Sequence, residues 1–166
     1  MSIIGIIASQ RQTNEIKKEI EKENLKLELI CINNKSIENI KNVKFEILII
    51  QDSIQKLNKN QEQIKDILKN TKYLLLNTDL SIEEEIFKDI KAKILTYGLK
   101  QKSTITASSI GEKQIIVSIQ RAFENFSGKI IEQQEIPVEL TKNSTRDVYN
   151  CLIKIAIINI LGAKNR

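Results

Sequence analysis

The sequence predicts an α/β fold: a doubly wound, mostly parallel sheet with helices on both faces, plus a small antiparallel β subregion before a C-terminal helix. Two observations lead to this fold class. In residues 1–100, short apolar runs alternate with polar stretches whose apolar residues recur at helical spacing, as in repeated strand–helix–strand units. In residues 101–140, β-branched runs follow one another closely with glycines between them, which is typical of antiparallel hairpins.

The parallel part is predicted from continuous apolar runs, which are typical of strands buried on both faces. These runs occupy residues 2–8, 27–32, 45–50, 73–76 and 93–97. Between them, helices are expected at residues 13–24 and 61–70 and from Ser81 onward. Ser81 and Glu84 have the spacing of a capping box, which marks a helix start. Strand–helix–strand crossovers are right-handed, so these strands are expected to lie parallel.

The remainder of the chain is expected to belong to the same domain, so that residues 1–166 form one unit. Strands are predicted at 103–109, 113–119 and 129–136, within the β subregion of residues 101–140. A closing helix is predicted over residues 144–162, where Ser144 and Asp147 form a second capping box. Gly162 is placed to end that helix in a left-handed conformation.

Composition and charge exclude several classes of function. The net charge is +5, but lysines are interleaved with glutamates, which indicates solvated helix faces rather than a nucleic-acid surface. No apolar run reaches roughly 18 residues, the length that a membrane span requires, and no signal-peptide pattern opens the chain. We therefore expect a cytoplasmic protein with neither nucleic-acid nor membrane partners.

Metal and thiol chemistry find little support in the sequence. Histidine is absent, which removes the commonest metal ligand and general base. Cys31 and Cys151 lie inside apolar runs, as small core residues do. The run from Glu83 to Glu85 could bind a metal, but acids at a helix start also favour the positive end of the helix dipole. The sequence predicts no metal site and no cofactor.

Three short motifs and a β-rich insertion occur in a fixed order in the second half of the chain. Residues 76–79 read LNTD, residues 94–98 read ILTYG, a β-rich stretch follows, and residues 146–162 read RDVYNCLIKIAIINILG. In order and spacing they resemble the central ATP-binding domain of the Mur ligase family, the ATP-dependent amide-bond ligases of cell-wall synthesis. The resemblance implies that Asn77 and Asp79 occupy positions of that family's nucleotide site.

The same resemblance extends to the N-terminus, where the family has a phosphate-binding loop, IGITGTNGKTTT. Residues 4–14 of this chain read IGIIASQRQTN. The loop glycines fall on Ala8 and Arg11, the lysine on Gln12 and the magnesium-binding hydroxyl on Thr13. Glycines allow backbone N–H groups to approach phosphates, and the lysine neutralises phosphate charge. Ala8, Arg11 and Gln12 supply neither, and Thr13 is expected to cap the first helix instead.

The sequence therefore predicts a pseudoenzyme without a functional phosphate loop, in which Ser9, Gln12, Thr13, Asn77 and Asp79 are degenerate nucleotide-binding positions. We expect a binding, scaffold or regulatory module linked to peptidoglycan synthesis in a bacterium. The family's flanking domains have no counterpart in the sequence, so a protein partner or a homo-oligomer is expected to cover the surfaces those domains would have covered.

Three alternatives stay open at this point. The chain could be a residual nucleotide or small-molecule binder with a crevice near Ser9, Asp52 and Asn77. It could be a ligase fragment that works with a partner chain. It could be an enzyme of another class, although Ser9 and Cys31 have no histidine to activate them. Asp52 and Asp79 follow predicted strands, where doubly wound folds place ligand groups, but aspartate there also starts turns.

A cluster in the β subregion has two open interpretations as well. Arg121, Phe123 and Phe126 lie between predicted strands. They either contact a partner or, in the case of the two phenylalanines, close the core of the β subregion. Tyr149, in the VYN part of the last motif, is expected to pack the closing helix on the sheet.

Overall fold

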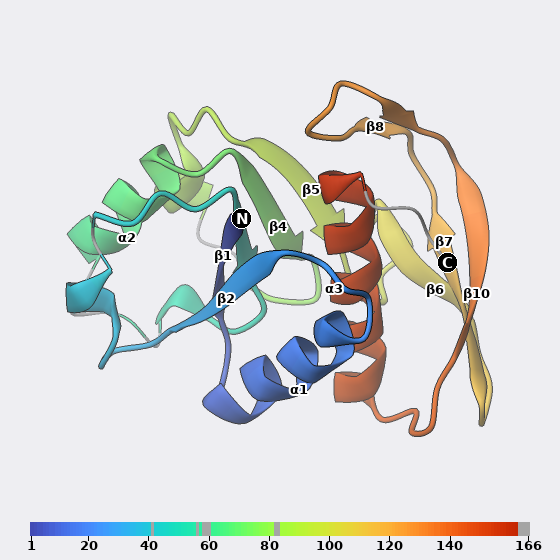
Figure 1. Ribbon diagram of the computed structural model, residues 1–166. Helices are drawn as coiled ribbons and strands as arrows, with labels where there is room; N and C mark the ends of the chain where they lie inside the picture. The colour runs from blue at the N-terminus through green and yellow to red at the C-terminus, as the bar shows by residue number, and fades with distance from the viewer. Residues whose placement is uncertain (41, 56, 58–60, 82–83, 163–166) are drawn as a thin grey trace.

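A single eight-stranded sheet runs through the whole protein, in the order β10-β7-β6-β5-β4-β3-β1-β2 (Figure 1). The computed structural model describes residues 1–40, 42–55, 57, 61–81 and 84–162. The parallel strands are β1 (Ser2–Ile7), β2 (Leu27–Ile32), β3 (Ile47–Ile50), β4 (Tyr73–Asn77) and β5 (Lys93–Tyr97). Their order, 2-1-3-4-5, is that of a doubly wound sheet whose direction of winding reverses between β1 and β3. The predicted fold class is confirmed.

The β subregion continues the same sheet rather than forming a separate layer. Strand β7 (Gln114–Ile119) pairs antiparallel with both of its neighbours, β6 (Ile105–Ile110) and β10 (Gln134–Glu139). The junction is one parallel bridge between Tyr97 and Ile105, so β6 starts where β5 ends. Strands β8 (Phe123–Glu124) and β9 (Ile130–Ile131) form a small second sheet.

The helices divide between the two faces of the sheet. Helices α1 (Gln10–Glu21) and α3 (Thr145–Leu161) pack on one face, and α2 (Gln61–Lys69) packs on the other with the 3₁₀ helix η1 (Ile37–Asn39). Helix α3 lies between α1 and the antiparallel strands (Figure 1). Because it has neighbours on most sides, its buried positions go nearly all the way round the helix, from Val148 to Ile160.

The ends of α3 confirm two predictions about capping. The Ser144 Oγ accepts a hydrogen bond from the backbone N–H of Asp147, and the Asp147 carboxylate accepts one from the N–H of Ser144. This is the reciprocal capping box that the sequence predicts. Gly162 ends the helix with φ of 78°, a left-handed conformation that glycine adopts without a Cβ penalty.

Several predicted elements differ from the structure in their bounds. Helix α1 begins at Gln10 rather than at residue 13, because Ser9 is extended and its Oγ accepts from the N–H of Gln12 at 3.1 Å. Thr13 is therefore not the cap, and this prediction was wrong. The strand expected from residue 45 begins at Ile47. The strand expected at 129–136 is divided between β9 and β10, and Pro137 is tolerated within β10 because β10 is an edge strand.

The β4–β5 crossover departs most from expectation. Instead of an α-helix from Ser81, the described part of this segment forms a 3₁₀ helix, η3 (Glu84–Phe87). Ile82 and Glu83, to which part of the prediction refers, lie outside the described residues. Asp89 has φ of 68°, a left-handed conformation that prevents the helical turn from continuing. No α-helix is therefore described between β4 and β5.

Candidate functional site

The carboxyl ends of the parallel strands, marked by the arrowheads in Figure 1, carry most of the residues that the sequence singles out. Ser9 follows β1, Asn33 follows β2, Asp52 lies just beyond β3, and the β4 strand ends at Asn77. Doubly wound folds bind ligands at this edge, next to the point where the winding reverses. Of the expected positions, Ser9 and Asn77 therefore lie at this edge, and their surroundings decide what they can do.

The β1–α1 connection holds no open loop that could surround a phosphate. Ser9 is the N-cap, so Arg11 and Gln12 already belong to the first turn of α1. Gln12 is only 7% exposed, and its Nε2 donates to Oδ1 of Asn150 on α3 at 3.0 Å. Thr13 is also buried and donates from Oγ1 to the carbonyl of Ser9. The residue at the lysine position of the resemblance thus joins two helices instead of facing the edge of the sheet.

Arg11 and Glu15 extend this contact toward solvent. Arg11 is exposed and pairs with Glu15 at 3.4 Å, while Nδ2 of Asn150 donates to Oε2 of Glu15 at 3.1 Å. Both polar groups of the Asn150 amide are therefore engaged, one by Gln12 and one by Glu15. These hydrogen bonds offset the desolvation cost of the buried amide, which would remain in full for an unpaired amide.

The β4–β5 side of the edge is organised by the Asn77 and Asp79 motif. Asn77 is 1% exposed, and its Nδ2 donates to Oε1 of Gln51 at 3.2 Å. Its Oδ1 accepts from the backbone N–H of Asp79 at 2.9 Å, which is a side-chain-stabilised turn. The turn directs the Asp79 carboxylate toward the β5–β6 connection, where it accepts from the N–H of Leu99 at 2.7 Å and of Lys100 at 3.2 Å.

Tyr149 of α3 completes this cluster. Its hydroxyl donates to Oδ2 of Asp79 at 2.7 Å, and its ring packs edge-on against Tyr97 with centroids 6.4 Å apart. Besides the packing contact expected for it, Tyr149 therefore makes a hydrogen bond to Asp79 that the sequence did not predict. Gly98 is required beside it, because φ is +150° and a Cβ there would lie 2.7 Å from Oγ1 of Thr78.

The pKa values in this cluster follow from burial and from the Asp79 hydrogen bonds. Partial burial alone would raise the pKa of Asp79, but the hydrogen bonds from Leu99, Tyr149 and Lys100 outweigh it, and the pKa is lowered. For Tyr149, burial and then the hydrogen bond to Asp79 raise the pKa to about 12. Burial also raises the pKa of Tyr97 well above its ordinary value. At neutral pH, Asp79 is a carboxylate that holds its neighbours in place.

A hollow of about 230 Å³ lies where the winding reverses, between the ends of β1, β2 and β3. Its lining residues are Ile7, Ala8, Ser9, Ile32, Asn33, Asn34, Asp52, Ser53 and Leu57. Among the expected site residues, Ser9 lines it; Gln12 and Thr13 are turned into the helix layer, and Asn77 and Asp79 lie beyond β3. The structure thus divides the expected site into three groups.

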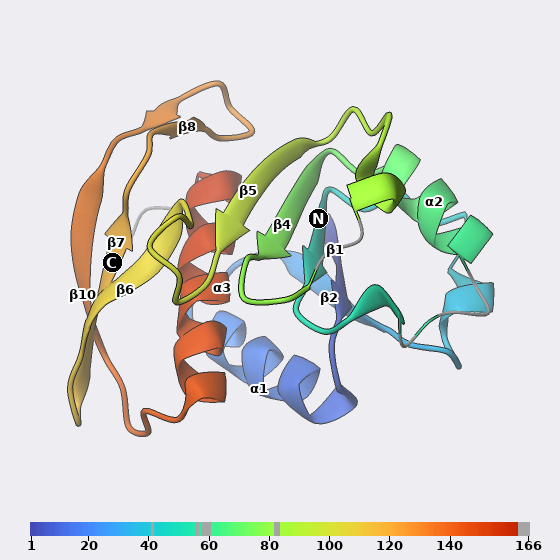
Figure 2. The same ribbon diagram turned by 180° about the vertical axis from the view of Figure 1, so that it is seen from behind.

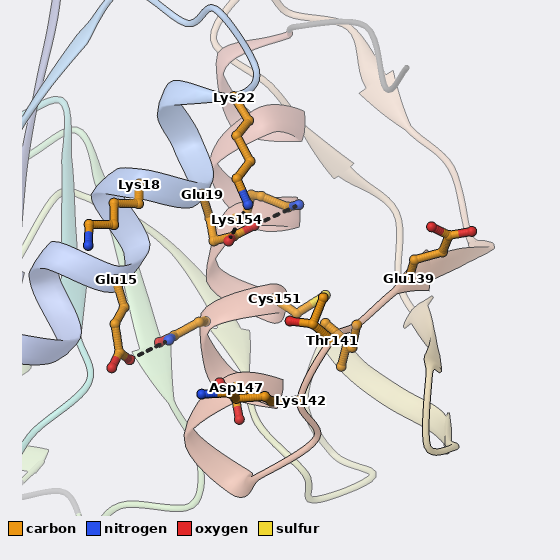
Figure 3. A pocket seen from close by; sticks show the side chains of 12 residues that line it. Glu15, Lys18, Glu19, Lys22, Glu139, Thr141, Lys142, Asp147, Cys151 and Lys154 are labelled. Carbon is orange, nitrogen blue, oxygen red and sulfur yellow. Dashed lines mark hydrogen bonds and ion pairs between the residues drawn. The ribbon is translucent and has the colours of Figure 1, made fainter.

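A second hollow, of about 340 Å³, lies between α1, α3 and the segment that connects β10 to α3 (Figure 3). Lysine and glutamate side chains line it together, and Lys154 pairs with Glu23 at 3.7 Å. Cys151 is the one thiol in its lining and is 5% exposed. Burial raises the pKa of Cys151 to about 11, so the thiol stays protonated at neutral pH and is a poor nucleophile.

Metal binding and membrane insertion find no support in the described ranges. In those residues no group of three or more His, Cys, Asp and Glu side chains could hold a metal ion. Of the helices described, none is both long and apolar enough to cross a bilayer. Both cysteines are free thiols, with Cys31 half-buried and Cys151 buried.

Comparisons with known proteins return no match: no protein-family model fits this chain, and no curated protein is similar to it. The geometry of the site is therefore the available guide to function. That geometry adds contacts that the sequence alone did not indicate, between Gln12 and Asn150 and between Asp79 and Tyr149. One feature of the sequence indicated their importance: all four residues lie in the segments that carry the resemblance.

Proposed function

We propose that this chain is a non-catalytic, Mur-ligase-like domain that acts as a binding, scaffold or regulatory module in cell-wall synthesis. The observation that supports this most directly is the environment of Gln12. In place of a lysine that faces phosphate, the position carries a neutral amide that is 7% exposed and bonded to Asn150. A phosphate site needs positive charge and free backbone N–H groups at this position.

The motif on the other side supports the same proposal. Asn77 and Asp79 have polar atoms that could contact a nucleotide, but these atoms bond to Gln51, Leu99, Lys100 and Tyr149 instead. A ligand would have to break charge-assisted hydrogen bonds, each worth about 1.5–3 kcal/mol, before it could use Asp79. The motif groups act here as internal supports of the sheet edge.

Isothermal titration of the full chain with magnesium and ATP tests the proposal. We expect no heat of binding at millimolar ATP, with an active Mur ligase as the positive control in the same buffer. Binding at micromolar ATP that depends on magnesium would contradict the proposal. Omitting magnesium separates a true nucleotide site from general attraction between ATP and a chain of charge +5.

A second candidate function is a small-molecule binder, supported by the hollow of about 230 Å³ at the ends of β1, β2 and β3. Its lining combines apolar side chains such as Ile7 and Ile32 with the polar residues Ser9 and Asp52, as in sites that bind a small compound with a few polar groups. A thermal-shift screen with nucleotides and wall precursors tests it. A ligand at 100 times its Kd adds about 2.7 kcal/mol to folded-state stability, which is a measurable rise in Tm; a screen without any rise argues against this candidate.

A further inference from the structure

No described helix covers the face of β5 opposite α3, although β5 is an interior strand. In the sheet order β5 lies between β4 and β6. Its residues Leu95 and Tyr97 point to the α3 side and are 2% and 0% exposed, whereas Ile94 points the other way and is 51% exposed. Parallel strands are ordinarily covered on both faces. Figure 2, which looks onto this side, shows β5 without a helix in front of it.

On this face of the sheet, side-chain burial differs sharply between the neighbouring strands β4 and β5. Leu74 of β4 is 0% exposed, and its register partner on β5 is Ile94. The difference arises because η3 has four residues, about 8 Å of 3₁₀ helix, whereas a five-residue strand such as β5 is about 17 Å long. The described part of the crossover therefore packs on the cluster that contains Leu74 of β4 and leaves Ile94 of β5 exposed.

Cations surround the bare face. A hollow of about 600 Å³ lies over it, and Lys100, Lys102 and Arg121 are part of its lining. All three are exposed. Of the described residues in the lining, Asp79 alone is acidic, and its carboxylate is already bonded to Leu99, Lys100 and Tyr149. The floor is apolar and includes Ile94, Leu76 and Phe87.

We propose that this β5 face, defined by Ile94, Leu76 and Phe87 with the cations Lys100, Lys102 and Arg121, binds an amphipathic helix with acidic flanks from another protein. The bound helix covers β5 as a crossover helix does in a complete doubly wound fold. A length of about 11 residues matches the strand, at 1.5 Å per residue against about 17 Å. Its apolar side contacts Ile94, and its carboxylates face the three cations.

A second copy of the chain is a poorer occupant on electrostatic grounds. Each copy carries a net charge of +5, so two copies repel each other at long range. The exposed side of α1 mixes Lys17, Lys18 and Glu21 and offers no acidic stripe. The inference rests on the proposed binding role, and it names the chemistry of the partner that the β5 face would bind.

The test is a fluorescence-anisotropy titration of the full chain against a labelled peptide of about 11 residues, with leucine on one helical face and glutamate on the other. We expect binding at micromolar concentration that weakens as salt rises. Ile94→Glu is expected to weaken binding about tenfold or more, since it removes apolar contact and adds an acid. Lys102→Glu is expected to weaken it about threefold.

The matched control is Ile110→Glu, because Ile110 is 46% exposed but does not line the hollow. It is expected to bind the peptide as the unaltered chain does. Circular dichroism melts of all variants establish that each one is folded. A peptide of the same pattern with lysine in place of glutamate is expected not to bind.

Several results would overturn the inference. They are the absence of binding at millimolar protein, equal binding by Ile94→Glu, and equal affinity for the lysine peptide. Self-association of the unaltered chain in sedimentation velocity, lost in Ile94→Glu, would assign the face to a second copy instead. Magnesium-dependent ATP binding would contradict the proposed function and leave these peptide results unchanged, so the two proposals fail separately.

Discussion

The two faces of the sheet differ in how completely they are covered, and the difference separates what stabilises this protein from what it offers to a partner. On the α3 face, one continuous cluster runs from α1 across α3 to the antiparallel strands, with Ile153 and Leu152 fully buried. On the opposite face, the cluster around α2 and η1 ends at β4. A complete layer is a core, whereas an interrupted one leaves apolar surface that another chain can cover.

The comparison also accounts for the motif residues. Gln12 and Asn150 join α1 to α3, and Tyr149 joins α3 to Asp79 at the sheet edge. These contacts all tie the covered layer together. The polar motif residues Gln12, Asp79 and Tyr149 are therefore bonded within the closed side of the molecule. The open side combines Leu76 and Ile94, which belong to the motifs, with cations outside them, such as Lys102 and Arg121.

The largest expected effect distinguishes adjacent residues of β5. Leu95→Ala is expected to lower the free energy of unfolding by about 2–5 kcal/mol, because Leu95 is 2% exposed in the α3-side core. Ile94→Ala, on the bare face, is expected to cost under about 1 kcal/mol. Urea unfolding followed by circular dichroism measures both. Equal losses would mean that Ile94 is covered in solution and that the two faces do not differ as described.

The next effect concerns the lysine position of the resemblance. Gln12→Lys places an ammonium group at a site that is 7% exposed and breaks the hydrogen bond to Asn150. We expect a loss of about 1–3 kcal/mol in the free energy of unfolding and no gain of ATP binding, since the glycines are still missing. Arg11→Lys, at an exposed neighbouring position, is the control and is expected to leave stability unchanged within about 0.5 kcal/mol.

Titration of ATP into the Gln12→Lys variant gives this prediction its second readout. Restored nucleotide binding would show that the charge alone was missing, and it would contradict the account of α1 as a helix that starts too early to surround a phosphate. A variant as stable as the unaltered chain would indicate that the Gln12 side chain is not held in the interface with α3.

These positions indicate how much of the structure could be predicted from the sequence. The doubly wound fold class, the β subregion and the capping box of Ser144 follow from local patterns, because strand burial and helix capping depend on residues close in the chain. The start of α1 did not follow. Ser9 and Thr13 are both capable caps, and the sequence does not indicate that the Gln12 side chain meets Asn150, 138 positions along the chain.

The bare face of β5 illustrates a second limit. Ile82, Ile86 and Ile90 recur at helical spacing, so periodicity alone predicts an α-helix there. The outcome depends on the left-handed conformation of Asp89, which no local pattern indicates. Contacts between site residues are still harder to predict, because they can join groups far apart in the chain. The hydrogen bond between Tyr149 and Asp79 joins groups 70 positions apart.

A smaller effect is expected at this hydrogen bond. Tyr149→Phe removes the phenol donor to Asp79 and is expected to cost about 1 kcal/mol, at the low end for a charged acceptor because Asp79 is half-exposed. The loss should depend on pH. The lowered pKa of Asp79 means that its stabilisation is present above the ordinary carboxyl pKa of about 3.9 and is lost as pH falls through the lowered value.

At alkaline pH the sign reverses, because Tyr149 is stabilised in its protonated form. Its pKa of about 12 lies above the ordinary value of about 10. The stabilisation is therefore complete below about pH 10 and is lost as pH rises to about 12. Urea unfolding of the unaltered chain and Tyr149→Phe across this range measures the difference. A difference that stays constant from acid to alkali would contradict the link between Tyr149 and Asp79.

The smallest effect is expected on the open face, at its rim of cations. Lys102→Gln removes one exposed charge and is expected to change the free energy of unfolding by less than about 0.5 kcal/mol. The same substitution is expected to weaken binding of the acidic peptide. It should also reduce the salt dependence of that binding, because one fewer charge on the protein is available to be screened. A large loss of stability would place Lys102 in the structural framework of the fold. A change in peptide binding without a change in stability would instead show that Lys102 acts in binding at the open face and does not stabilise the core.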